Sequence, residues 1–310
     1  MGPWRDSSPL RGEPSTKASE ESPAARTIGR VARVAIIGAG NLGSFLAAHL
    51  LQNGHDVFFC VRRPMPSVRV DGVGAATVPC YMDKPPAADI VLLTVKAHDT
   101  PAARRWLRYF DAPVAVIQNG VHHAERVAPH PAIPVLSYVY IEARDGIHYP
   151  YAPPMEHFTV PAEAASQPFV RLFPNSPIRI RLEETFAEAA WRKMLHNCVS
   201  NPLTCIAGRG LEILREPLYQ EWAWRILDEA VPVAQADGAN IGKEDAERAM
   251  AILASYPPGT RTSMLQDRER GKTLEIGALN GAIVELGRRY GLPTPVNEDL
   301  VAKLVQSSET

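Results

Sequence analysis

The sequence predicts an α/β protein in which an N-terminal domain with a parallel sheet precedes an all-helical C-terminal domain. The apolar run at 34–37 leads into a glycine-rich turn and then an amphipathic segment, which is the pattern of a strand, a tight turn and a helix. Further apolar runs alternate with helical stretches, which is typical of a parallel sheet covered on both faces. Beyond about residue 183, almost every segment has helical periodicity.

Composition and charge restrict the class of partner. The chain has 310 residues, which is enough for two domains of ordinary size. Its formal net charge is -1, so it has no broad basic field for nucleic acid. No apolar run approaches the roughly 20 residues that cross a bilayer, and the N-terminus lacks the apolar stretch of a secretory signal. We therefore expect a cytoplasmic protein whose partner is a small molecule, not nucleic acid or a membrane.

The four cysteines are scattered along the chain without a C-x-x-C pair. This spacing fits a reducing compartment and argues against both a disulfide framework and a zinc site. We expect no metal.

Shifts in composition predict the domain boundaries. Residues 1–32 contain four prolines among many Ser, Glu and Arg, a composition that cannot bury enough apolar surface to offset the entropy of ordering. We expect a disordered tail there, since its scattered acidic residues argue against the alternative of a transit peptide. Residues 33–183 would then form the dinucleotide-binding domain, and residues 184–310 the helical domain.

Apolar runs mark the strands of the first domain, and helical periodicity marks the helices of the second. The predicted strands lie at 34–37, 57–61, 90–95, 114–117 and 135–139. The clearest predicted helices lie at 218–233 and 279–290.

The glycine-rich turn has the form G-x-G-x-x-G. It comprises Gly38, Ala39, Gly40, Asn41, Leu42 and Gly43. Because it follows a strand and opens a helix, it predicts a Rossmann-type dinucleotide site. Gly38 permits the tight turn, Gly40 lets the backbone approach the pyrophosphate, and Gly43 lets the helix pack closely on the strand. The helix N-terminus would face the anion, and the alternative is a glycine-rich turn that binds nothing.

The end of the second strand indicates which dinucleotide is bound. NAD sites usually place Asp or Glu about 20 residues after the glycines, where it holds the ribose hydroxyls. This chain has Arg62 and Arg63 there. A guanidinium can bind a 2′-phosphate through charge-assisted hydrogen bonds, so we expect NADP(H) with Arg62 as a ligand. The alternative is two solvated surface arginines.

Two further polar residues follow later strands, at the edge where ligands collect in open α/β sheets. Lys96 follows the run at 90–95, and Asn119 follows the run at 114–117. We expect both side chains to line the cleft. Alternatively, Lys96 is a surface lysine at a helix start, and Asn119 tolerates a left-handed turn before a glycine.

A polar stripe marks one helix of the second domain. Lys193, Asn197 and Asn201 recur at intervals of four residues and therefore share one helical face. A lysine and two carboxamides are costly to bury without a ligand or partners, which favours a polar cleft over the alternative of a solvated face. We expect Pro202 to kink the helix just past Asn201.

Glu275 lies inside an apolar pattern. A buried carboxylate needs a partner such as a lysine or a hydroxyl ligand. The alternative is a glutamate in an N-terminal turn, stabilised by the helix dipole.

From about Arg33 to the C-terminus, the chain resembles the ketopantoate reductases, which reduce 2-dehydropantoate to pantoate on the route to pantothenate and coenzyme A. The resemblance rests on the glycine motif, 94–97, 118–121, the Lys193 helix and 263–281. It implies NADPH-dependent reduction of this 2-keto acid to (R)-pantoate. The stretch 138–158, rich in proline and aromatic residues, matches the family poorly, and Gly277 stands where the family commonly has Asp.

The resemblance also implies roles for individual residues. Lys193 would be the catalytic lysine, which binds the keto oxygen and supplies the proton as hydride arrives from the nicotinamide. Glu275 would be the second catalytic residue, accepting a hydrogen bond from the substrate hydroxyl near the lysine. The remaining implied contacts are Asn197, Asn201, Ser263 and Asn119 with the substrate, and Lys96, Asn119 and Glu275 with the cofactor.

Two other functions stay open at this point. A related NAD(P)-dependent dehydrogenase would act on another 2-keto or 2-hydroxy acid and would not need the hydroxyl that Glu275 holds. A cofactor sensor without enzymatic activity would need no proton donor beside the nicotinamide. The oligomeric state is also open, with a homodimer as one option.

Overall fold

The computed structural model describes residues 31–65, 67–151, 156–174 and 176–306, and in these residues the predicted fold class is confirmed. The tail expected at 1–32 lies outside the described residues, except for Val31 and Ala32. The domain boundaries stay predictions. Below, the sheet half denotes residues 33–183 and the helical half denotes residues 184–306.

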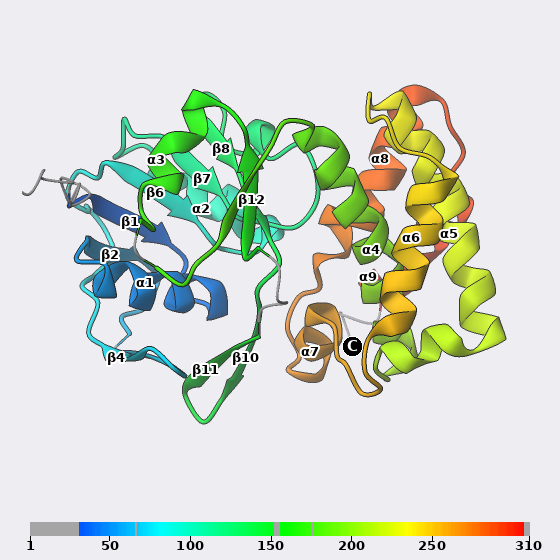
Figure 1. The fold of residues 1–310 in the computed structure, drawn as a ribbon, viewed down its shortest axis with the longest axis horizontal. Coiled ribbons are helices and arrows are strands. Elements are labelled where there is room, and N and C mark those ends of the chain that lie inside the picture. Colours follow the sequence, from blue (N-terminus) through cyan, green and yellow to red (C-terminus); the bar gives the residue numbers. More distant parts are fainter. Residues whose placement is uncertain (1–30, 66, 152–155, 175, 307–310) are drawn as a thin grey trace, which may run out of the picture. The chain divides into compact units, whose positions relative to one another are not determined.

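A six-stranded parallel sheet forms the centre of the sheet half, in the order β5-β2-β1-β6-β7-β8 (Figure 1). Its strands are β1 (Arg33–Ile37), β2 (Asp56–Cys60), β5 (Cys80–Tyr81), β6 (Ile90–Leu93), β7 (Val114–Val116) and β8 (Ala132–Pro134). Every neighbouring pair is parallel. Ile37 pairs with Cys60 on one side and with Leu93 on the other, so the carboxyl ends of these strands meet at one edge.

Both faces of this sheet are covered, as the continuous apolar runs predicted. On β1, Val34 and Ile36 belong to one apolar cluster, whereas Ala35 and Ile37 belong to another. Helix α1 (Asn41–Gln52) contributes to the first cluster, and α2 (Thr100–Leu107) contributes to the second. The connections also contain η1 (Ala97–Asp99), η2 (Ala124–Arg126), η3 (Ala164–Ser166) and α3 (Gln167–Val170).

Two smaller sheets complete the sheet half. They consist of β10 (Tyr140–Arg144), β11 (Ile147–Tyr151), β3 (Val68–Val70) and β4 (Gly74–Ala76) in one, and of β13 (Ile180–Glu183), β12 (Phe158–Pro161) and β9 (Leu136–Ser137) in the other. The run expected at 135–139 does contain a strand, β9, but its expected place in the parallel sheet is wrong. The last parallel strand is β8, which ends at Pro134, and the following β9 pairs antiparallel with β12. Because β8 is short and ends in a proline, its apolar pattern is too brief to be recognised in the sequence.

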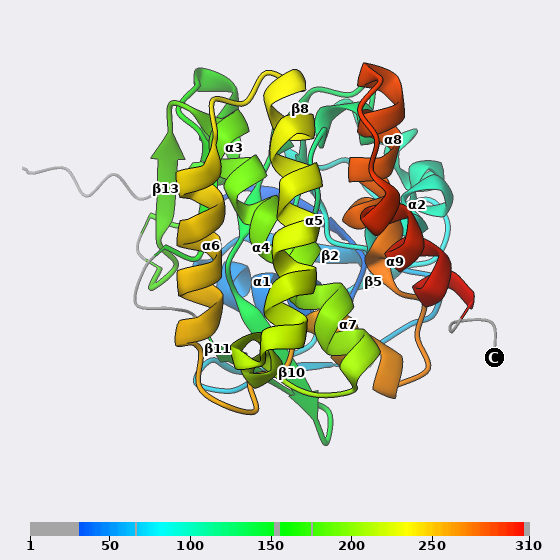
Figure 2. The same ribbon diagram turned by 90° about the vertical axis from the view of Figure 1, so that its right-hand side faces the viewer.

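Within the described residues, only helices follow β13. They are α4 (Phe186–Ala207), η4 (Leu211–Arg215), α5 (Pro217–Ala236), α6 (Lys243–Ser255), α7 (Ser263–Glu269), η5 (Glu275–Ala278), α8 (Asn280–Tyr290) and α9 (Pro295–Gln306). Helix α4 packs against α5, α6 and α7, and α5 and α6 run beside it in both views (Figures 1 and 2). The apolar cluster around α4 is the core of the helical half.

Helix α4 continues as one helix across Pro202, and the kink expected there stays a prediction. Because proline has no N–H, the carbonyl of Cys198 loses its helical donor. The Asn280 side chain supplies a replacement, since its Nδ2 donates to that carbonyl at 2.9 Å and to Asn297 Oδ1 at 2.9 Å. Helix α4 is thus fastened at this point to α8 and α9.

The four cysteines are free thiols. In the part of the chain that the structure describes, no group of His, Cys, Asp or Glu could hold a metal ion. In the same part, no helix combines the length and the apolar character needed to cross a membrane.

Candidate active site

The glycine motif forms the turn between β1 and α1. Gly38 has a φ of +107°, and a Cβ there would lie 2.7 Å from a Val95 methyl group. A Cβ on Gly43 would overlap the carbonyl oxygen of Gly38, whereas a Cβ on Gly40 would meet nothing within 4 Å. The backbone is therefore crowded at the first and third glycines and open at the second. This pattern fits a ligand that approaches the chain at Gly40.

The same turn presents unsatisfied backbone donors. Helix α1 begins after Gly40 without a side-chain cap and without an acidic residue in its first turn, so its first N–H groups can meet an anion. Thr94 Oγ1 donates to the Gly38 carbonyl at 2.7 Å and holds the turn on the end of β6. Asn41 Nδ2 donates to the Ile141 carbonyl at 2.9 Å, which joins α1 to β10.

Arg62 and Arg63 lie just beyond β2, after Val61, and both are exposed. Neither has a hydrogen bond or an ion pair with another residue that the structure describes. Both guanidinium groups are therefore free to meet a ligand at the strand edge.

Glu275 is a buried carboxylate that receives several hydrogen bonds. It begins η5, is 6% exposed, and accepts three hydrogen bonds from the sheet half: Lys96 Nζ at 2.9 Å, Ala97 N at 3.0 Å and Asn119 Nδ2 at 3.4 Å. Burial raises the pKa of Glu275, but the Lys96 charge and these hydrogen bonds lower it more, so its pKa lies below the usual value. The carboxylate is therefore held ionised.

Lys96 bonds to a second buried carboxylate. Its Nζ lies 2.9 Å from Glu275 Oε2 and 3.1 Å from Asp267 Oδ2, on α7. Burial lowers the pKa of Lys96, and the two carboxylates raise it more, so the net pKa is raised. The sequence predicted a partner for Glu275 but gave Asp267 no role. The only available signal was an acidic residue beside the apolar residues Met264 and Leu265.

Lys193 lies on α4, on the other side of Asn119. Its Nζ donates to Asn119 Oδ1 at 3.4 Å and lies 5.4 Å from the centre of the Tyr138 ring. Burial lowers the pKa of Lys193 to about 8, although the Glu275 charge raises it. The Asn119 carboxamide therefore bridges Lys193 and Glu275, accepting from the lysine and donating to the carboxylate. Tyr138 was not predicted as a site residue, because the stretch that contains it resembled the family poorly.

The other predicted substrate residues meet where α4 faces the N-terminus of α7. Asn201 is 5% exposed, and its Nδ2 donates to Asn197 Oδ1 at 3.3 Å. Its Oδ1 accepts from Ser263 Oγ at 3.4 Å and from the Met264 N–H at 3.3 Å. Asn201 thus has partners within the protein and couples Asn197, on the same helical face, to Ser263 on α7.

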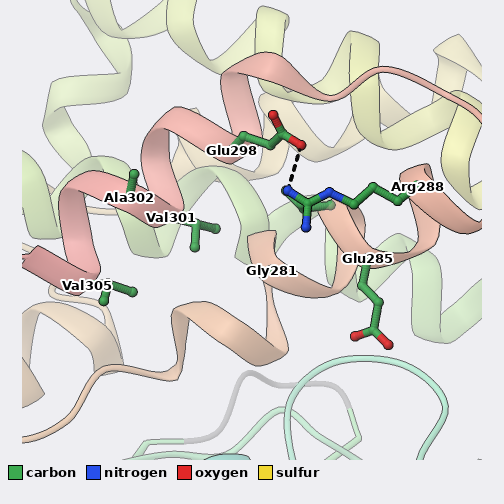
Figure 3. A pocket seen from close by; sticks show the side chains of 8 residues that line it. Gly281, Glu285, Arg288, Glu298, Val301, Ala302 and Val305 are labelled. Carbon is green, nitrogen blue, oxygen red and sulfur yellow. Dashed lines mark hydrogen bonds and ion pairs between the residues drawn. The ribbon is translucent and has the colours of Figure 1, made fainter.

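A groove among the described residues lies elsewhere. It has a volume of about 600 Å³ and runs between α8 and α9. Arg288 and Glu298 form an ion pair of 3.0 Å there, and Val301 lines the groove nearby (Figure 3). None of the residues predicted for catalysis or cofactor binding lines it. This groove is therefore separate from the candidate site, which is defined by converging polar groups with shifted pKa values.

Both halves of the chain match sequence models of one family. The model described as ketopantoate reductase PanE/ApbA matches residues 34–144, and the model of the C-terminal part of the same family matches residues 185–307. The 2-dehydropantoate 2-reductase of Mycobacterium tuberculosis is 30% identical over 290 residues, which cover 89% of this chain and 98% of that protein. The enzyme of the same name from Archaeoglobus fulgidus is 32% identical over 298 residues, covering 91% and 99%.

A solved structure agrees with these sequence matches. The dimeric ketopantoate reductase from Staphylococcus aureus superposes with a TM-score of 0.80 at 25% identity. The match covers 89% of this chain and 99% of that one. The two halves are thus arranged in a known fold along nearly their whole length.

The position of Glu275 predicts a pH response of Lys193. Because the carboxylate charge raises the pKa of Lys193, Glu275→Gln should move that pKa below its wild-type value of about 8. Competitive labelling with acetic anhydride, read at Lys193 by mass spectrometry, measures the neutral amine as pH rises. The labelling midpoint should therefore fall in Glu275→Gln and stay constant in Glu285→Gln, which changes an exposed glutamate on α8. An unchanged midpoint in Glu275→Gln would refute the coupling.

Proposed function

This chain belongs to the ketopantoate reductase family, and we propose that it reduces 2-dehydropantoate to (R)-pantoate with NADPH, as a step of pantothenate and coenzyme A biosynthesis. The observation that carries the proposal is the bridge of Asn119 between Lys193 and Glu275. It brings a proton donor and an ionised acceptor to the edge of the sheet at which the glycine turn lies. Reduction of a keto acid that carries a hydroxyl group would use the donor at the keto oxygen and the acceptor at the hydroxyl.

The residues at this edge fit a dinucleotide. The open backbone at Gly40 and the uncapped start of α1 would receive the pyrophosphate. The unpaired guanidinium of Arg62 would bind a 2′-phosphate, and Lys96 and Asn119, which follow β6 and β7, would face the nicotinamide side of the cleft. NADP(H), when bound, supplies the hydride.

Lys193 would supply the proton. Reduction places negative charge on the former keto oxygen, and a nearby ammonium both stabilises that charge and donates the proton. A pKa of about 8 keeps most of the lysine protonated near neutral pH while making it a better acid than an ordinary lysine. Activity that depends on this ammonium falls as pH rises through about 8. The carbonyl of Asn119 accepts one proton of the ammonium and thereby restricts its direction.

Glu275 would hold the substrate hydroxyl. A carboxylate oxygen accepts more than one hydrogen bond, and Oε1 accepts only the Ala97 N–H among the described residues. It therefore has capacity for a hydroxyl proton. Asn197 and Ser263 would position the rest of the substrate, with Asn201 as the link that orients both.

The loss of NADPH absorbance with 2-dehydropantoate as substrate tests this function. The matched control is trimethylpyruvate, which differs from 2-dehydropantoate only in lacking the hydroxyl group. A site built to bind that hydroxyl should reject the control by about four orders of magnitude in kcat/KM. Equal turnover of the two acids would identify a dehydrogenase for other 2-keto acids. Tight NADPH binding without oxidation by either acid would identify a sensor. Either outcome would overturn the proposal.

Cofactor preference tests the role of Arg62. Arg62→Asp removes a charge-assisted contact with the 2′-phosphate and adds repulsion, so it should raise the Kd for NADPH by about 10- to 100-fold. The Kd for NADH should hardly change, because NADH lacks that phosphate. Fluorescence titration measures both constants, and Arg63→Asp is the matched comparison. If Arg62→Asp leaves the ratio of the two constants unchanged, Arg62 is not the phosphate ligand.

A further inference from the structure

One arginine holds the loop that carries Asn119. Arg126, at the end of η2, donates from Nη1 to the side-chain oxygen of Gln118 at 3.1 Å and to the Asn119 carbonyl at 2.9 Å. Its Nη2 donates to the Val121 carbonyl at 2.9 Å. All three acceptors belong to residues 118–121, which we call the Asn119 loop. The planar guanidinium thus contacts both ends of this loop and restricts its conformation.

The Asn119 loop is confined from the opposite side as well. Gly120 has a φ of +99°, and a Cβ there would lie 2.5 Å from Arg126 Nη2 and 2.6 Å from the Ala278 carbonyl oxygen. Ala278 ends η5, the same short helix that begins with Glu275. The loop is therefore held between the guanidinium of Arg126 and the element that carries the buried carboxylate.

Arg126 also connects to the segment around Lys96. The Gln118 side chain, whose oxygen accepts from Arg126, donates from Nε2 to the Val95 carbonyl at 2.8 Å and to Thr100 Oγ1 at 2.8 Å. Its orientation is fixed by these three contacts. Through Gln118, one guanidinium fixes the loop after β7 relative to the loop after β6, and both loops bond to Glu275.

The charge of Arg126 has no carboxylate partner. It forms no ion pair with any residue that the structure describes, and burial lowers its pKa while the Glu275 charge raises it. A partly buried cation without an ion pair is costly unless its donors are satisfied. The loop conformation that offers three oxygens is therefore stabilised relative to those that do not.

We propose that Arg126 is the positioning residue of the active site, which fixes the Asn119 loop so that the carboxamide bridges Lys193 and Glu275. The proposal rests on the proposed function in one respect, since it takes the Asn119 bridge to be needed for turnover. Arg126 itself acts through Asn119 and does not touch the substrate.

A double-mutant cycle tests whether Arg126 acts through Asn119. Arg126→Met keeps the apolar stem but leaves three oxygens without a donor, so the loop should shift and kcat should fall by about 10²-fold. In an Asn119→Ala background the same change should cost almost nothing, because the bridge is already lost. Arg105→Met, which removes an exposed guanidinium lying over the Trp106 ring, is the matched control and should leave kcat unchanged. Independent, multiplying losses from Arg126→Met and Asn119→Ala would overturn the proposal.

A second readout does not depend on activity. Crystal structures of the wild type and of Arg126→Met should show the Lys193 to Asn119 and Asn119 to Glu275 contacts broken in the variant. If the wild type fails to reduce 2-dehydropantoate, the proposed function is lost, but this comparison still decides the role of Arg126. Arg126→Lys, whose single ammonium can reach fewer of the acceptors, serves if the methionine variant does not fold and should show a smaller displacement. Unchanged contacts in either variant would overturn the proposal.

Discussion

The buried carboxylate of Glu275 is the constraint on which the site depends. Removing a carboxylate from water costs several kcal/mol unless charges and donors replace the lost hydration. Here all the replacements come from the sheet half, as the ammonium of Lys96, the N–H of Ala97 and the amide of Asn119. The loops after β6 and β7 therefore stabilise the position of element η5. Neither half of the chain forms this site alone.

The position of Lys193 also depends on tertiary contacts, which are made by helix α4. Helix α4 carries Lys193 within the core of the helical half, where α5, α6 and α7 surround it. Helix α4 is also connected to His122, just after the Asn119 loop, through contacts that both make with Asp237. Trp191 Nε1 donates to Asp237 Oδ2 at 2.9 Å, and the His122 ring lies 2.8 Å from the same carboxylate oxygen. Lys193 and Asn119 are thus each two or three residues from a side chain that bonds to Asp237, which keeps the lysine within reach of the carboxamide.

Much of this arrangement follows from local sequence pattern. The crowding around the glycine turn could be predicted from the motif. A strand that passes directly into a helix leaves room for a Cβ only at the middle glycine. Lys96 and Asn119 were expected to line one cleft because parallel strands end at one edge of a sheet, and both donate to Glu275. The stripe of Lys193, Asn197 and Asn201 predicted one face of a helix, and the structure places Asn197 and Asn201 in contact there.

The pairing across the two halves could not be predicted in this way. Lys96 and Glu275 are 179 residues apart, and nothing in the local pattern of either indicates that the partner is Lys96 and not Lys193. The second carboxylate on Lys96, from Asp267, depends on how α7 packs. The hydrogen bonds that Arg126 donates to three oxygens depend on the path of the Asn119 loop, which is set by tertiary contacts. Such contacts leave no periodic trace in the sequence.

The most direct test of the account is the effect of Lys193→Ala on turnover and on cofactor binding, measured on one preparation. If the ammonium acts on the developing charge, kcat with 2-dehydropantoate at saturating NADPH should fall by about 10³-fold or more. The Kd for NADPH, measured by fluorescence, should stay within about twofold, since this role belongs to the transition state. A parallel loss of NADPH affinity, or a kcat within about tenfold of the wild type, would contradict the assignment of Lys193 as the proton donor.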